Sequence, residues 1–530
     1  MQHIQYDSVM DECAFKGLGD IEAQVRRFER EERRRLGLNE KPEHWHDPCP
    51  ETFTREQRTH TTILFNGITL AHDVIIETGL AAMGYNIQVL DTPDNDALQL
   101  GKEYGNRGQC NPTYYTVGNL IKYLDSLYKE EGLSKQEIVK RYILLTVGAC
   151  GPCRFGMYKT ENRKALRDAG YDGFRIIFFQ NAMNFRQSHA EAGLALTPRF
   201  FITLLKCIMA GDVLNAMGYR IRPYETEQGE TDKVLKACRQ RVCQALLDSS
   251  SLLKALYDCK RLFKSIALDR LQARPKVSVI GEFWAMTTEG EGNYALQRFL
   301  ESEGAEVEVQ PVTGWIMYKI WEAEYNVRER MLLRRQHEAR RPQVLKPFRT
   351  LLMIKLTKWV MKASFCSFSW ALGLRHYHLS DMEENASLSK KYYLNELRGG
   401  EGHMEVGKVI QSTVHRKANL VISVKPFGCM PSSCVSDGVQ SKVLNDYPDA
   451  HFLAVETTGD GAVSVYSRVQ MEMFRARQRA TEELNQALQA RQLGATTVRQ
   501  RSQGSAIRHC ASKHPAHKVA STAANLVYGL

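Results

Sequence analysis

Residues 61–93, TTILFNGITLAHDVIIETGLAAMGYNIQVLDTP, decide the fold class. They predict a β-branched apolar strand, a helix that ends at Gly84 and a second apolar strand. Two strands joined through a helix form a βαβ unit, in which the strands run parallel. The stretch therefore predicts an α/β protein built on a parallel sheet.

The same alternation continues along the chain. Residues 142–147 predict a strand, 156–169 a helix and 173–180 another strand, and residues 197–265 are mostly helical. Four further strands are expected in the second half, at KVSVIGEFW (276–284), AEVEVQPV (305–312), NLVISVKPFGC (419–429) and HFLAVET (451–457). We therefore expect two open α/β domains, each with a parallel sheet and helical additions.

Length and composition divide the chain into four parts. Its 530 residues are too many for one hydrophobic core. We expect a charged lead-in (1–58), a first domain (59–265), a second domain (266–492) and a basic, disordered tail (493–530). The second domain would contain a long basic helical insertion at 313–395.

The sequence predicts a cytoplasmic protein without a transmembrane segment. Its start, MQHIQYDSVMDECAF, lacks the basic and apolar regions of a secretory signal. The most apolar stretch, 349–374, is interrupted by Lys355, Lys358 and Lys362 at helical spacing, which is typical of an amphipathic helix. Such a helix either packs in the protein or docks on a membrane surface or a partner.

The net charge of +11 is concentrated in residues 325–349 and in the last 40 residues. A solvated surface explains such runs, and an acidic partner is the alternative. No zinc-finger, KH-type or RNP-type signature accompanies the charge, so we expect no nucleic acid.

Cysteines at the ends of predicted strands carry the functional argument. Cys150 and Cys153 follow the strand 142–147 in a CGPC turn, and Cys429 and Cys434 follow the strand 419–425. Cys110 lies in a loop just before a helix. Ligands of open α/β sheets bind beyond the carboxyl ends of the strands, where helix N-termini favour thiolates. We therefore expect Cys110, Cys153 and Cys429 to converge in one cleft.

Four explanations of these cysteines stay open at this point. Soft thiolates from loops of two domains are typical of an iron–sulfur cluster. A structural zinc site usually takes two compact CxxC pairs, and only one is present. A thioredoxin-like CGPC dithiol accounts for Cys150 and Cys153 but leaves Cys110 and Cys429 unexplained. Apolar packing is the fourth explanation, and it suits Cys207 and the other cysteines in helical patterns.

Two stretches resemble nucleotide-binding loops but lack essential features. GHMEVGK (402–408) is followed by Val409 rather than by a magnesium-binding hydroxyl. GEGNYA (290–295) is flanked by Glu289 and contains Glu291, and these carboxylates would repel a pyrophosphate. The sequence predicts no nucleotide-hydrolysis site.

Four segments resemble the iron–sulfur subunits of the 2-hydroxyacyl-CoA dehydratase and activase superfamily, in particular its long activase-associated proteins. They are GKEYGNRGQCNPTYYTVGNLIKYL (101–124), GACGPCRFGMYKTENRKALRDAGYDGFRIIFFQ (148–180), GEFWAMTTEGEGNYALQRFLE (281–301) and KPFGCMPSS (425–433). The resemblance covers roughly residues 42–490, and the GPCRFG and PFGCMP pieces are its specific parts.

The resemblance implies flavodoxin-like domains around a 4Fe–4S or double-cubane cluster. It implies Cys110, Cys153 and Cys429 as ligands, with Cys150 as a candidate fourth and Cys434 as a further candidate. Arg154, directly after Cys153, would place charge or hydrogen bonds near the sulfurs.

The resemblance also implies partners. A separate activase with an actin-like fold would hydrolyse ATP and donate electrons, and the basic residues 325–349 are a candidate docking surface for it. An acyl-CoA substrate and a homo- or hetero-oligomer belong to the same expectation. The candidate functions are an ATP-dependent reductase component, a 2-hydroxyacyl-CoA dehydratase subunit, a non-catalytic cluster scaffold and, outside the family, a CGPC thiol oxidoreductase.

Overall fold

The computed structural model describes part of residues 24–37 and the ranges 53–148, 153–180, 193–194, 196–337, 345–397, 400–502 and 517–530. The chain forms two compact units, Met1–Cys49 and Pro50–Leu530. In the first unit, the described residues between 24 and 35 are helical, and Arg27 pairs with Glu31 at 3.3 Å. Both sheets belong to the second unit.

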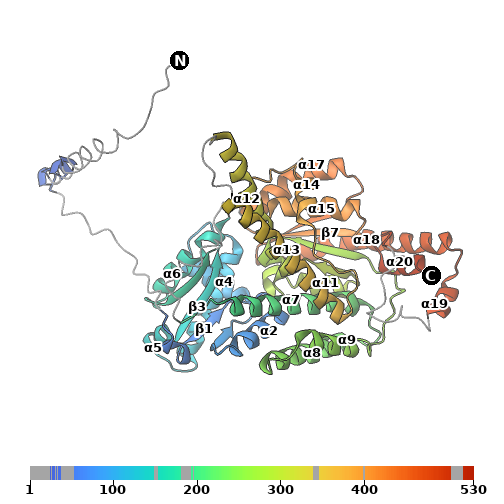
Figure 1. Ribbon diagram of the computed structural model, residues 1–530, viewed down its shortest axis with the longest axis horizontal. Helices are drawn as coiled ribbons and strands as arrows, with labels where there is room; N and C mark the ends of the chain where they lie inside the picture. The colour runs from blue at the N-terminus through green and yellow to red at the C-terminus, as the bar shows by residue number, and fades with distance from the viewer. Residues whose placement is uncertain are drawn as a thin grey trace, which may run out of the picture. The chain divides into compact units, whose positions relative to one another are not determined.

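The first sheet is four-stranded, parallel throughout and ordered β2-β1-β3-β4. Its strands are β1 (Thr62–Phe65), β2 (Ile87–Val89), β3 (Tyr142–Gly148) and β4 (Arg175–Gln180). Successive residues point to opposite faces. Ile63 therefore joins a core with α2 (Leu70–Ala81) and α7 (Pro198–Ile221), while Leu64 joins one with α4 (Asn111–Lys129) and α6 (Tyr158–Asp168). Helices therefore cover both faces (Figure 1).

The second sheet repeats this topology in the order β6-β5-β7-β8, again parallel throughout. Its strands are β5 (Lys276–Gly281), β6 (Glu306–Val309), β7 (Leu420–Pro426) and β8 (Phe452–Thr457). Val424 packs on one face with α11 (Leu296–Ser302) and α18 (Ala462–Ala490), and Val421 packs on the other with α15 (Gly402–Val414). The predicted fold class is confirmed, and both sheets have the flavodoxin-like order of their first four strands.

The helices alternate with these strands and form the additions. They are α2 (Leu70–Ala81), α3 (Asn95–Tyr104), α4 (Asn111–Lys129), α5 (Lys135–Arg141), α6 (Tyr158–Asp168), α7 (Pro198–Ile221), α8 (Glu230–Leu247), α9 (Leu252–Phe263), α10 (Phe283–Thr287), α11 (Leu296–Ser302), α12 (Val312–His337), α13 (Leu345–Leu372), α14 (Met382–Ser389), α15 (Gly402–Val414), α16 (Met430–Cys434), α17 (Gln440–Asp446), α18 (Ala462–Ala490), α19 (Ala495–Ser502) and α20 (Thr522–Tyr528). Short 3₁₀ turns include η2 (Arg154–Met157), and a π-helical turn, η6, covers Val435–Val439.

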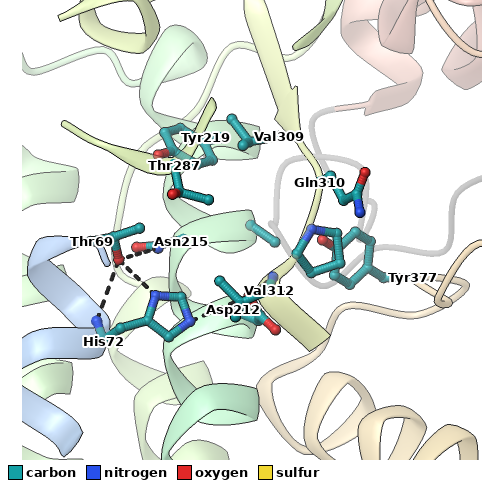
Figure 2. Close-up of a pocket in the computed structure, with 12 residues that line it drawn as sticks. Thr69, His72, Asp212, Asn215, Tyr219, Thr287, Val309, Gln310, Val312 and Tyr377 are labelled. Atoms are coloured by element: carbon teal, nitrogen blue, oxygen red, sulfur yellow. Dashed lines mark hydrogen bonds and ion pairs between the residues drawn. The ribbon is translucent and has the colours of Figure 1, made fainter. Parts of the chain in front are cut away.

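A buried histidine–aspartate pair joins α2, α7 and α12 (Figure 2). His72 and Asp212 are 1% and 4% exposed, and Nε2 of His72 lies 3.3 Å from Oδ1 of Asp212. Nδ1 of His72 lies 2.8 Å from the Thr69 hydroxyl. The Asp212 carboxylate also accepts hydrogen bonds from the backbone N–H groups of Val312 and Thr313, at 2.7 and 2.8 Å. The pair thus caps α12, beside a cavity of about 20 Å³ that has room for one water molecule.

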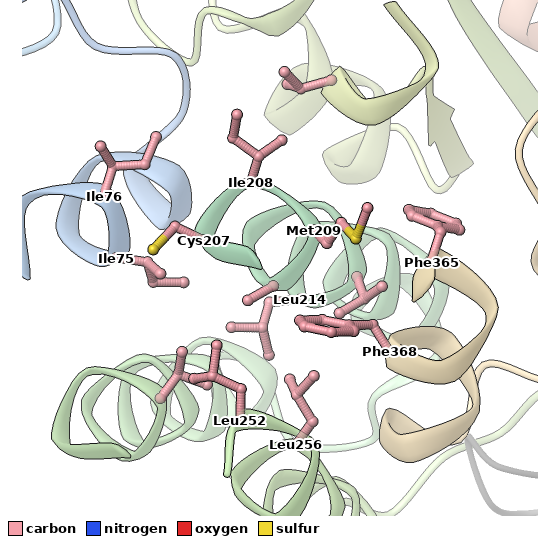
Figure 3. Packing of buried hydrophobic residues seen from close by; sticks show 14 of the residues in the cluster. Ile75, Ile76, Cys207, Ile208, Met209, Leu214, Leu252, Leu256, Phe365 and Phe368 are labelled. Atoms are coloured by element: carbon pink, nitrogen blue, oxygen red, sulfur yellow. The ribbon is translucent and has the colours of Figure 1, made fainter. Parts of the chain in front are cut away.

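One hydrophobic core connects the two halves of the second unit. Helix α7 packs against α2, α8, β6, α12 and α13, and α13 packs against α9. In Figure 3, Ile75 of α2, Leu214 of α7, Leu252 of α9 and Phe365 of α13 gather in this core. The predicted boundary near residue 265 is therefore no break between cores, because the insertion helices pack on helices of the first half.

Helix α7 also bears on the question of membrane spans. Pro198–Tyr224 is the one segment of the described chain that is long and apolar enough to cross a membrane. More than half of its most apolar window is buried inside the protein, as expected for a core helix.

The end of the chain is folded where it is described, so the prediction of a disordered tail is wrong for residues 493–502 and 517–530. Helix α20 packs against α18, and its Thr522 hydroxyl donates to Oε2 of buried Glu306 at 2.5 Å. The prediction relied on the low apolar content of the whole tail. The few small apolar residues of its last helix, α20, are nevertheless buried. Residues 503–516 lie outside the described part.

Candidate functional site

The carboxyl-terminal edges of the two sheets meet at the N-terminus of α4. The backbone N–H of Asn111 donates to the carbonyl of Phe427, just after β7, at 3.0 Å. The Asn111 side chain, 1% exposed, donates to the carbonyl of Thr457 at the end of β8 at 2.8 Å. The two sheets are thus connected where parallel α/β folds bind their ligands.

Three of the predicted cysteines lie at this junction. Each is the N-cap residue of a helix or helical turn: Cys110 of α4, Cys153 of η2 and Cys429 of α16. Cys110 and Cys429 are 8% and 7% exposed, and Cys153 is half-buried. A Cβ atom added to Gly428 would lie 3.2 Å from Cα of Cys110, so the two cysteine loops are in contact. Cys110 also lies close enough to Cys153 to affect its acidity, so the three residues are neighbours at the junction, and their convergence in one cleft stays a prediction.

Arg154 connects the loops that carry the cysteines. Its Nη1 donates to the carbonyl of Gly108, two residues before Cys110, and to that of Gly428 at 3.3 Å. The guanidinium therefore bridges the two halves of the junction. Arg154 thus holds the loops of Cys110 and Cys429 together, and it also places a positive charge near them.

Hydroxyl groups surround the Cys110 thiol. Its Sγ lies 3.3 Å from the Thr113 hydroxyl and 3.6 Å from the hydroxyl of buried Tyr158. Burial raises the pKa of Tyr158 well above its usual value, so the phenol stays protonated and is able to donate a hydrogen bond to sulfur.

Burial has the largest effect on the pKa values of the other two thiols, those of Cys153 and Cys429. It raises the pKa of Cys153 to about 12, with Glu401, Glu282 and Cys110 adding to the rise. Burial and then Glu282 raise the pKa of Cys429 as well. The expectation that helix N-termini favour thiolates here is therefore wrong for these residues in the bare chain. A bound cation would be needed to stabilise their thiolates.

Three glutamates that the sequence analysis missed surround the cysteines. Glu282 directly follows β5, Glu401 accepts a hydrogen bond from Nε1 of Trp315 at 2.7 Å, and Glu405 accepts one from the Ser432 hydroxyl at 2.6 Å. Burial raises the pKa of Glu282 to about 8, that of Glu405 to about 7, and that of Glu401. Burial thus disfavours the charged forms of these three glutamates, as it does those of Cys153 and Cys429.

A signal for these glutamates existed in the sequence. Glu282 lies in the predicted strand segment 276–284, near its carboxyl end, and Glu401 and Glu405 are four residues apart at the start of a helix. Glu405 belongs to the GHMEVGK stretch, which lacks the hydroxyl of a P-loop.

Among the described residues, no three His, Cys, Asp or Glu side chains are gathered so that they could hold a metal ion. Thiolates are the usual donors to iron–sulfur clusters, and the cluster stays a prediction. Cys150, the candidate fourth ligand, lies outside the described residues. Cys434 is exposed at the end of α16, where it adds to the rise in the pKa of Tyr393.

The carboxylates of the rejected GEGNYA stretch have a structural role. Oε2 of Glu289 accepts a hydrogen bond from the backbone N–H of Leu70, at the start of α2, at 2.6 Å. Oε2 of Glu291 accepts one from that of Asn95, at the start of α3, also at 2.6 Å. Negative charges at two helix N-termini stabilise the contact between the halves.

No family model matches the chain, and no curated protein matches its sequence. The residues of the junction therefore carry the functional inference.

Gly428→Ala tests the contact between the cysteine loops. Gly428 has φ +78°, and a Cβ atom there would lie 2.9 Å from the Gln109 carbonyl oxygen. We expect the variant to lose about 1–2 kcal/mol of unfolding free energy and to bind less iron than the wild type. In the control, Gly438→Ala, the new Cβ meets no atom within 4 Å. Equal iron in both variants, measured after anaerobic purification, would contradict the prediction.

Proposed function

We propose that this chain is the iron–sulfur component of an ATP-dependent, low-potential electron-transfer system of the 2-hydroxyacyl-CoA dehydratase and activase type, working in the cytoplasm. The convergence of Cys110, Cys153 and Cys429 at the N-termini of three helical segments is the observation that supports this function. The chain would receive electrons from a separate activase and pass them to an acceptor.

The residues of the junction would bind and tune the cofactor. A bound 4Fe–4S or double-cubane cluster would supply a one-electron carrier. Cys110, Cys153 and Cys429 would hold it, and Arg154 keeps two of the three loops together. Glu282 and Glu405 place carboxyl groups beside the Cys429 thiol, where burial disfavours their charged forms. Hydrogen bonds and charge near a cluster tune its reduction potential.

Helix α12 is the candidate route of contact with an activase. Its first turns approach the site, where Nε1 of Trp315 donates to Glu401. Farther along, Arg328 and Arg330 are exposed, although Arg328 also pairs with Glu324. Arg328 is therefore partly neutralised within the chain, whereas Arg330 would be available to an acidic partner.

Thiol–disulfide exchange by the CGPC pair is the alternative function. A redox dithiol needs one accessible thiolate of low pKa, which in a CxxC motif is the first cysteine. Cys150 holds that position and lies outside the described residues, so the raised pKa of Cys153 does not separate the two functions. A dehydratase subunit would use the same cluster, and the cysteine geometry does not separate it from a reductase component.

Anaerobic purification, followed by iron and acid-labile sulfide quantitation, tests the proposal. We expect about four or more irons per chain, with matching sulfide and an EPR signal after dithionite reduction. An iron-free protein in which Cys150 and Cys153 cycle between dithiol and disulfide would overturn it.

A further inference from the structure

Helix α13 carries apolar side chains on two opposite faces. One face is buried against α7 and α9 and consists of Ile354, Met361, Phe365, Phe368 and Leu372, each at most 7% exposed. The other is exposed to solvent. Its residues, which we call the outer face, are Phe348 (61% exposed), Leu352 (60%), Met353 (62%), Leu356 (51%), Trp359 (67%) and Val360 (46%). A helix that is apolar all round is normally buried all round, and this one is not.

The outer face is a continuous stripe. Its members are separated by one, three or four residues, which places them on the same side of an α-helix. Trp370, 63% exposed, lies farther along the helix beside a groove of about 1050 Å³. Leu253 and Tyr257 of α9, 41% and 50% exposed, also line this groove and extend the apolar surface. Contiguous exposed apolar surface of this kind marks an interaction site.

The charges of α13 are all positive. Its 28 residues include no Asp or Glu. Arg349 and Lys355 are exposed and form no ion pair with the residues that the structure describes. Lys358, by contrast, pairs with Glu324 at 2.6 Å. The outer face is therefore bordered by free positive charge.

We propose that the outer face of α13 binds an anionic lipid surface, with the helix lying in the plane of the interface. Leucine, tryptophan and phenylalanine on one side with lysine and arginine nearby are typical of interfacial helices. Between Leu352 and Val360 the face offers no hydrogen-bonding group except the Trp359 indole. Protein interfaces carry regular hydrogen bonds, whereas a lipid surface needs none. A second copy would place the cations of two such helices side by side.

Co-sedimentation of the full-length protein with vesicles tests this inference. We expect binding to phosphatidylcholine vesicles with about one third phosphatidylglycerol, weaker binding to pure phosphatidylcholine, and a decrease with added salt. Leu352→Ser combined with Trp359→Ser should lower the partition coefficient at least about tenfold, because two large apolar side chains no longer enter the interface. Lys355→Gln should weaken binding to the anionic vesicles alone.

The matched control is Val463→Ser combined with Phe474→Ser, two apolar residues of α18 that are 82% and 61% exposed. This variant should bind like the wild type, and circular dichroism would check the folding of both double variants. Three results would overturn the inference: no binding to anionic vesicles at low salt, equal losses in the two double variants, or a dimer in solution that only the α13 substitutions dissociate. The last would make a second copy the occupant.

Discussion

Cys429→Ala and Cys153→Ala, made separately, are each expected to lower the iron bound after anaerobic purification below about a fifth of the wild-type amount. Both residues are N-caps at the junction of the two sheets. Removing one of three converging thiols leaves a cluster without a ligand at that corner. The acid-labile sulfide should fall in parallel.

Cys207→Ala is the matched control for these variants. Cys207 is 1% exposed on α7, where its Sγ packs close to Gly79 in the main core. Its loss removes core volume and some stability but no ligand, so we expect wild-type iron. Exposed Cys434→Ala should also retain iron. Equal amounts of bound iron in the Cys153, Cys429 and Cys207 variants would contradict the assignment of the ligands.

Asp212→Ala is expected to cost about 3 kcal/mol or more of unfolding free energy. The carboxylate pairs with His72 and accepts hydrogen bonds from the first backbone N–H groups of α12. These groups lie within the core that joins the two halves. Removal of the carboxylate leaves two buried backbone N–H groups without their acceptor and the buried His72 without its counter-charge, with only the Ile208 carbonyl, at 3.1 Å, still near Nε2. Urea denaturation followed by tryptophan fluorescence measures the loss.

Asp258→Ala is the control for this loss, because it breaks an ion pair of comparable length that is largely in solvent. Asp258 pairs with Arg241 at 2.8 Å between α9 and α8. Ion pairs in solvent contribute little to stability, so the change should be much smaller. Similar losses in both variants would show that the buried pair has no special role.

The pH dependence of the Asp212→Ala loss provides a second check. Burial disfavours the charged His72 imidazole, but Asp212, with smaller contributions from Asp73 and Glu289, outweighs it and raises the pKa of His72. A raised folded-state pKa adds stability that is fully present below the unfolded-state pKa and is lost as pH rises through the folded-state value. The difference between wild type and variant should therefore be larger near pH 6 than near pH 8, about the ordinary pKa of histidine. The opposite trend would contradict a charged pair.

The local pattern of the sequence determined the elements and the position of the cysteines. Apolar strands followed by turns and helices predicted the βαβ units, since each strand of a parallel sheet is buried on both faces and reads as an apolar run. Because the carboxyl ends of parallel strands share one edge, the same pattern placed Cys153 and Cys429 where ligands bind. Cys110 was predicted to join these two cysteines because it lies in a loop just before a helix.

Only the tertiary structure decided how distant segments meet. The bridge from Arg154 to the loop of Cys429, and the position of Glu282 and Glu405 beside the thiols, depend on contacts between the two halves that no local pattern encodes. Burial also reversed the expected acidity of the Cys153 and Cys429 thiols, because the dielectric around a group is set by everything packed on it. In the sequence, the residues of both apolar faces of α13 form a single apolar stretch. Packing determined which of the two faces the protein covers and which it leaves to solvent.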